Sequence, residues 1–169
     1  EILHNNNGFR AAVLDVHEFL TKVGLSDSFS AQLKPIAKAV AIHDACHMIH
    51  GQGIQQQPRT LLAAIPDLEL REAMEAGVCC GSAGIYNLVQ PEEAAELGTI
   101  KANDLSNTGA TLVASANIGC TLQLRRHLEG RQPVYHPMEL LAASAGLHPL
   151  PSLKQAAVGA EIAGEGDDR

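Results

Sequence analysis

The sequence predicts an α/β fold, a small Rossmann-like parallel sheet of about four strands with flanking helices. The main observation is that short apolar runs alternate with helical patterns along most of the 169 residues. The length allows one domain that buries a core of its own. Aromatic residues make up only 3% of the chain and Trp is absent. The core is therefore expected to consist of Ala, Leu, Ile and Val, which suits close helix packing.

The first predicted element is a helix that ends at Gly24, a residue typical of helix C-caps. Its apolar residues recur at steps of four and three, which places them on one face: Phe9, Val13, Val16, Leu20 and Val23. Residues 25–35 are expected to form a loop or a short helix. We interpret residues 1–35 as a helical lead-in to the main domain.

Four short runs are predicted as strands: residues 37–42, 68–73, 112–116 and 133–135. Helices are predicted between and after them: from Pro58 through Ile65, from Pro91 to about residue 107, over 122–128, and from Pro137 to about residue 145. Strands that alternate with helices run parallel in one sheet. This domain is expected to cover residues 36–148. Residues 149–169 lose periodicity and end in Gly and acidic residues, which predicts a mostly disordered tail.

The four cysteines follow the ends of predicted strands. Cys46 follows the first strand, Cys79 and Cys80 follow the second, and Cys120 follows the third. The carboxyl ends of parallel strands share one edge, where open α/β sheets bind ligands, so the four thiols are expected to converge. Four thiolates can bind an iron–sulfur cluster or Zn²⁺. Buried structural cysteines are the alternative.

Histidines near the same edge form a second group. His47 is a further candidate metal ligand, whereas His43 and Asp44 are expected to organise the loop through hydrogen bonds. The Gly51-Gln52-Gly53 segment lacks the third glycine of a dinucleotide-binding loop, so no nucleotide site is expected.

The charge balance and the chain start limit the function classes. Twelve basic against nineteen acidic residues give a net charge of −7, which argues against a nucleic-acid partner. No apolar run approaches the roughly 18–20 residues of a transmembrane segment. The chain begins with neither a signal peptide nor an initiator Met, and we expect it to be a fragment of a longer protein.

Taken together, the motifs resemble the cysteine-rich CCG domain of the heterodisulfide reductases, and more closely the C-terminal CCG domain of the glycolate oxidase iron–sulfur subunit. They are HDACH at 43–47, CCGSAGIYN at 79–87, NIGC at 117–120 and HPMELL at 136–141. The resemblance covers about residues 36–146. It implies that Cys46, Cys79, Cys80 and Cys120 are cluster or metal ligands. In one departure, Gln123 stands where the fuller pattern has a fifth cysteine.

The resemblance implies an electron-transfer module with one [4Fe–4S] cluster, the C-terminal fragment of the iron–sulfur subunit of a flavin-linked glycolate (2-hydroxyacid) oxidase. Its partners would be flavin-containing oxidase subunits and the ferredoxin-like part of the same polypeptide, and the fragment would hold no complete active site. Its location would be cytoplasmic, either free or at the inner face of the cell membrane. Two alternatives stay open: a structural Zn²⁺ domain that docks subunits, and a thiol–disulfide site on Cys79 and Cys80.

Overall fold

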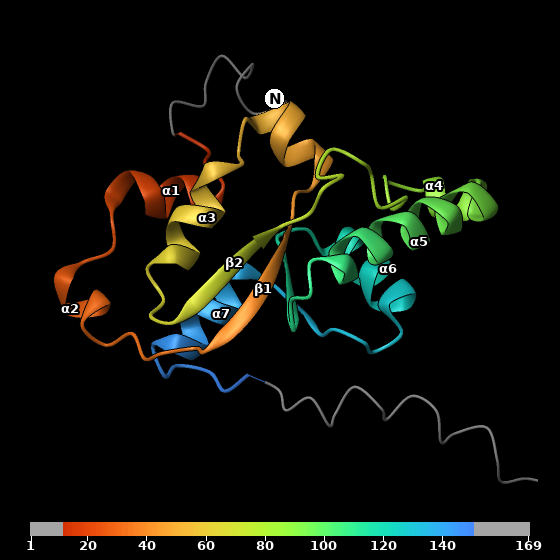
Figure 1. The fold of residues 1–169 in the computed structure, drawn as a ribbon. Coiled ribbons are helices and arrows are strands. Elements are labelled where there is room, and N and C mark those ends of the chain that lie inside the picture. Colours follow the sequence, from red (N-terminus) through yellow and green to blue (C-terminus); the bar gives the residue numbers. More distant parts are fainter. Residues whose placement is uncertain (1–11, 151–169) are drawn as a thin grey trace, which may run out of the picture.

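The computed structural model describes residues 12–150 and contains a four-stranded sheet in which every neighbouring pair is parallel (Figure 1). The strands are β1 (Lys38–His43), β2 (Leu68–Glu72), β3 (Leu112–Ser115) and β4 (Val134–Tyr135), and their order in the sheet is β2-β1-β3-β4. Together with the flanking helices, this confirms the predicted fold class. The predicted tail from residue 151 onward lies outside the described residues, and the predicted domain boundaries stay predictions.

The helices cover both faces of the sheet. In chain order they are α1 (Val16–Val23), α2 (Asp27–Ser30), the π-helix η1 (Met48–Gln52), α3 (Gln56–Ala63), α4 (Tyr86–Val89), α5 (Pro91–Asn107), α6 (Ile118–Leu128) and α7 (Pro137–Ser144). Alternate residues of β1 supply two separate apolar clusters. Val40 and Ile42 pack with α3 and α7, whereas Ala41 packs with α5 and α6. The result is a three-layer sandwich (Figure 1).

The sheet order creates a switch point between β1 and β3. From β1 the chain moves to β2 on one side, and it then returns to β3 on the other side of β1. The carboxyl ends of these two central strands are level, because His43 pairs with Ser115 in the register. In doubly wound sheets, ligands bind outside the carboxyl ends of the strands at such a point. The fold therefore places the loop after β1 and the start of α6 at a favourable position for a site.

Helix α1 differs from the sequence pattern in where it starts. Asp15 accepts a hydrogen bond from the backbone N–H of His17, and Glu18 completes a capping box, so the helix begins at Val16 and Val13 of the pattern precedes it. The buried side chain of this helix is His17, which is 0% exposed, whereas Val16 is 41% exposed. The apolar stripe of the pattern is thus largely at the surface within the described residues.

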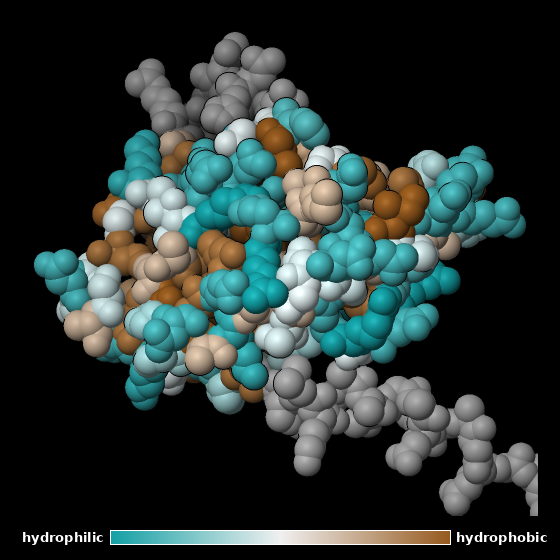
Figure 2. All heavy atoms as spheres, in the orientation of Figure 1, coloured by the Kyte–Doolittle hydropathy of each residue, from teal (hydrophilic) through white to brown (hydrophobic). Residues whose placement is uncertain are grey.

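Helix α4 also carries exposed apolar side chains. Leu88 and Val89 are exposed on this short helix, and Ile85 is exposed just before it. Figure 2 shows hydrophobic atoms at the end of the molecule where α4 lies. Helix α4 follows directly after the loop that contains the adjacent cysteines, so this apolar surface begins close to them in the chain.

Candidate metal centre

Cys79 and Cys80 lie on the loop between β2 and α4, whose backbone requires a glycine. Gly81 has a φ of +81°, in the left-handed region, and its N–H donates to Cys79 Sγ at 3.3 Å. A Cβ atom at this position would clash with the carbonyl oxygen of Ala94 in α5. The loop therefore packs directly against the α5 backbone, which fixes the two cysteines relative to the sheet.

Two charged residues of α5 hold the start of the same loop. The Asp104 carboxylate accepts hydrogen bonds from the backbone N–H groups of Met74 at 3.0 Å and Glu75 at 3.1 Å. The buried Lys101 donates to the carbonyl oxygen of Glu75, and its Nζ lies 3.6 Å from Asp104. These contacts give the buried Lys101 ammonium group its partners, and they satisfy the backbone hydrogen-bonding groups of the turn after β2. The sequence interpretation did not identify either residue.

Cys120 is positioned by the start of α6. Asn117 caps this helix, and its side-chain oxygen accepts the N–H of Cys120 at 3.0 Å. A Cβ atom at Gly119 would lie 2.7 Å from Ser82 Oγ, so the first turn of α6 packs tightly on the cysteine loop. Cys120 and the Cys79–Cys80 pair therefore meet although they are far apart in the sequence.

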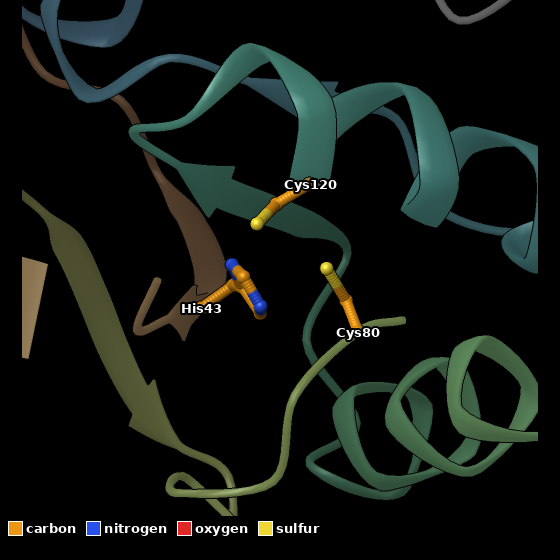
Figure 3. A group of neighbouring side chains, drawn as sticks. All are labelled: His43, Cys80 and Cys120. Atoms are coloured by element: carbon orange, nitrogen blue, oxygen red, sulfur yellow. The ribbon is translucent and has the colours of Figure 1, made fainter. Parts of the chain in front are cut away.

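The side chains of His43, Cys80 and Cys120 point toward one another at the switch point (Figure 3). All three are buried, and their ligand atoms lie within 4.8 Å of one another. Cys46 and Cys79 are partly buried and lie outside this group, but both act electrostatically on Cys120 and raise its pKa. The structure thus brings Cys80 and Cys120 together with His43, and it places the free thiols of Cys46 and Cys79 in the loops nearby. Their role as ligands stays a prediction.

The hydrogen bonds among these groups favour one thiolate. The pKa of Cys80 is lowered to about 4 because its sulfur accepts hydrogen bonds from the Cys120 thiol, His43 and the Ser82 backbone N–H, against the effect of burial. The same hydrogen bond raises the pKa of Cys120, and burial adds to that effect. Burial is also the main reason why the pKa of Cys79 is raised. These contacts therefore favour the thiolate form of Cys80 over that of Cys79 or Cys120.

The structure brings His43, and not His47, to the sulfur atoms. His47 is exposed at the start of η1, and it is absent from the candidate ligand group within residues 12–150. The signal that could have identified His43 is the alternation along β1. His43 lies two residues after Ala41, whose side chain faces α5 and α6, and side chains two apart in a strand share a face.

Asp44 organises its loop, as the sequence predicted. Its carboxylate accepts two hydrogen bonds from Arg59 in α3, at 2.9 and 2.8 Å, and Gln55 Nε2 lies 3.4 Å away. Arg59 also binds Glu72 at the end of β2, at 2.8 and 2.7 Å, and both carboxylates raise its pKa. The guanidinium group thus joins the carboxyl ends of β1 and β2 directly before the Cys46 loop.

Gln123 contacts α5 and its own helix through its side chain. It is buried in α6, and its Nε2 donates to the carbonyl oxygen of Ala94 at 2.9 Å and lies 3.3 Å from His127 Nε2. The residue in the place of the family's fifth cysteine therefore joins α6 to α5. The same carbonyl oxygen is the one that excludes a side chain at Gly81. In this chain, the position serves the packing of the two helices that enclose the site.

Comparisons with known proteins match this arrangement. The model of the cysteine-rich domain family, CCG, matches residues 40–125. A fumarate reductase (CoM/CoB) subunit of Methanothermobacter marburgensis is 36% identical over 138 residues, which cover 79% of this chain and 27% of that protein. The probable glycolate oxidase iron-sulfur subunit of Bacillus subtilis is 36% identical over 114 residues, which cover 64% of this chain and 26% of that protein.

A third relative is the glycolate oxidase iron-sulfur subunit of Escherichia coli, 32% identical over 104 residues, which cover 62% of this chain and 25% of that protein. The chain thus spans about a quarter of the length of these three relatives. Among the described residues, no helix combines the length and the hydrophobicity that crossing a membrane would require. The family match includes Cys46, Cys79, Cys80 and Cys120. The chain belongs to the cysteine-rich CCG domain family.

Proposed function

We propose that this chain is an electron-transfer module that binds one [4Fe–4S] cluster through Cys46, Cys79, Cys80 and Cys120. The observation that carries the proposal is that Cys80 and Cys120 meet at the switch point of a parallel sheet, while the free thiols of Cys46 and Cys79 act electrostatically on Cys120 from the neighbouring loops. Relatives that are named iron-sulfur subunits support the choice of an iron–sulfur cluster.

The donor set fits such a cluster. Thiolates are its usual protein ligands, and four suffice for the [4Fe–4S] type. Hydrogen bonds already favour the thiolate form of Cys80. Burial of Cys80 and Cys120 limits the access of water, whereas the partial exposure of Cys46 and Cys79 leaves one side of the site near the surface. A bound cluster would supply reversible one-electron chemistry, and the chain would contribute ligation, burial and hydrogen bonds to sulfur.

The wider assignment is part of the proposal and rests on the family resemblance. The module would serve a flavin-linked oxidase of glycolate or another 2-hydroxyacid, and its partners would be the flavin-containing subunits and a ferredoxin-like part of the same polypeptide. Since the chain spans only about a quarter of the relatives, oxidation of the substrate would take place elsewhere in the complex. The location would be cytoplasmic, with any contact to the inner face of the cell membrane made through the complex.

A structural zinc site is the second candidate. His43, Cys80 and Cys120 offer one nitrogen and two sulfur atoms within 4.8 Å of one another, and a thiolate from Cys46 or Cys79 as the fourth ligand would complete the tetrahedral set of a structural Zn²⁺ site. The domain would then dock partner subunits without transferring electrons. Visible absorption separates the two candidates, because an iron–sulfur cluster is brown whereas Zn²⁺ is colourless. A third candidate, thiol–disulfide chemistry, predicts that the count of free thiols changes on treatment with reductant.

The test is anaerobic analysis of the purified chain for iron, sulfide and zinc, followed by two variants. Cys80→Ser replaces a soft thiolate with a hard oxygen and should lose most of the bound metal. Gln123→Ala should retain it, because the Gln123 side chain points to Ala94 in α5. Iron and sulfide in the wild type would support the cluster, and zinc alone would support the second candidate. Equal metal content in the wild type and Cys80→Ser would contradict the ligand assignment.

A further inference from the structure

Among the His, Cys, Asp and Glu side chains of the described residues, the buried imidazole of His43 is the non-sulfur group that joins Cys80 and Cys120 at the candidate centre. It lies at the carboxyl end of β1, within 4.8 Å of the sulfur atoms of both Cys80 and Cys120 (Figure 3). A hydrogen bond from this side chain is among the causes that lower the pKa of Cys80. The four-cysteine assignment leaves this histidine without a role.

The other ring nitrogen of His43 is held by Ser115. Nδ1 lies 3.3 Å from Ser115 Oγ, on the neighbouring strand and at the paired position of the register. The hydroxyl can donate to Nδ1, which leaves the proton on Nε2, and Nε2–H can then donate to the Cys80 sulfur. Ser115 is fully buried, so the ring is fixed between a strand and a sulfur atom.

The donors around Cys80 differ in whether they persist when metal binds. The Cys120 thiol loses its proton when it becomes a ligand, and its S–H donor is then lost. The nitrogen donors, His43 and the backbone N–H of Ser82, carry protons that ligation of Cys120 does not remove. The coordinated sulfur of Cys80 would therefore keep both of these N–H donors, one from a side chain and one from the backbone.

We propose that His43 is a positioning residue that donates a hydrogen bond from its ring to the Cys80 ligand sulfur and thereby raises the reduction potential of the bound cluster. This inference rests on the proposed function. The partial positive charge of an N–H group stabilises the extra electron of the reduced state, and hydrogen bonds to sulfur are among the features that set cluster potentials. Ser115 acts through His43 by holding the ring in the orientation that donates.

The experiment uses the full chain, loaded anaerobically with iron and sulfide, and measures iron per chain and the midpoint potential. His43→Ala should retain iron and shift the potential to a more negative value. His43→Gln keeps an N–H donor and should recover part of the shift, and Ser115→Ala should give a smaller negative shift. His47 is an exposed histidine in the segment that follows β1, so His47→Ala is the matched control and should leave the potential unchanged.

Pulsed EPR of the reduced chain labelled with ¹⁵N-histidine gives a second measurement. A weak nitrogen coupling that disappears in His43→Ala is expected for an N–H···S contact. The strong coupling of a directly bound nitrogen, with loss of iron in His43→Ala, would overturn the proposal in favour of His43 as a ligand. An unchanged potential in a fully loaded His43→Ala variant would overturn it while leaving the proposed function intact. A wild-type chain that takes up no iron or sulfide would overturn both.

Discussion

Replacing Arg59 with Ala should destabilise the protein by about 3–5 kcal/mol, the usual cost of removing one partner of a buried ion pair. The Arg59 side chain is 13% exposed and that of Asp44 is 5% exposed. Without the guanidinium group, the Asp44 carboxylate would stay buried, and its remaining side-chain contact would be the long one to Gln55 Nε2, at 3.4 Å. The pair of Arg59 with Glu72 contributes little to this figure, because Glu72 is 57% exposed and water screens it.

Urea unfolding of the metal-free chain, followed by far-UV circular dichroism, measures the loss of stability. Glu72→Ala is the matched control and should cost about 0–1 kcal/mol. In an Asp44→Asn background, Arg59→Ala should cost clearly less than in the wild type, because no buried charge is then left unpaired. If Arg59→Ala unfolds the chain outright, Arg59→Lys can be measured in its place. The lysine loses the bidentate contact with Asp44 and should give an intermediate loss of stability. A cost for Arg59→Ala no larger than that of Glu72→Ala would refute the reasoning.

Two further predictions concern the cysteine loop and pH. Gly81→Ala should lose clearly more stability in the same urea assay than Gly84→Ala, because only at Gly81 would a Cβ meet the Ala94 carbonyl oxygen. Gly84→Ala should cost about 1–2 kcal/mol for its positive φ alone. Equal losses of stability in the two variants would contradict the close packing of the loop on α5. Burial and the neighbouring His17 lower the pKa of His136, so the stability that its neutral ring contributes is present above a pH of about 6.5 and is lost as the pH falls further. His136→Asn keeps a side chain that can cap α7 but does not titrate in this range. Its stability should therefore fall less than that of the wild type between pH 7 and pH 5. If the stabilities of the variant and the wild type fall in parallel with pH, His136 does not contribute.

The sheet and the meeting of the cysteines could be predicted because both follow from periodicity. Apolar runs separated by helical patterns specify parallel strands, and parallel strands place their carboxyl ends on one edge. Even a short apolar run is enough for this prediction: strand β4 has only two residues, and the sequence predicts a strand over 133–135. The boundaries of the helices follow less closely from the pattern. Helix α3 starts at Gln56, two residues before the proline that is expected to open it.

The rest of the site could not be predicted because it depends on contacts between distant residues. Lys101 and Asp104 look like an ordinary charged pair on a helix, yet they bind the turn that leads to the cysteines. Gln123 gave no sign that it would bind the Ala94 carbonyl group. His43 was assigned to the loop because it follows an apolar run, whereas the structure makes it the last residue of β1 and directs its side chain toward the sulfur atoms.

The order of the strands also has a consequence for how the protein would acquire the proposed metal centre during its synthesis. Cys46 and Cys120 are separated in the chain by β2, α5 and β3, and they meet only because β3 returns to pair with β1. A local pair of cysteines can capture a metal on an unfolded chain, but these thiols cannot act together before that non-local pairing has formed. The proposed four-cysteine centre would therefore be completed only after folding, even if the adjacent Cys79 and Cys80 bound metal earlier. A completed centre would bind the folded state, so its retention and the folding equilibrium would become linked.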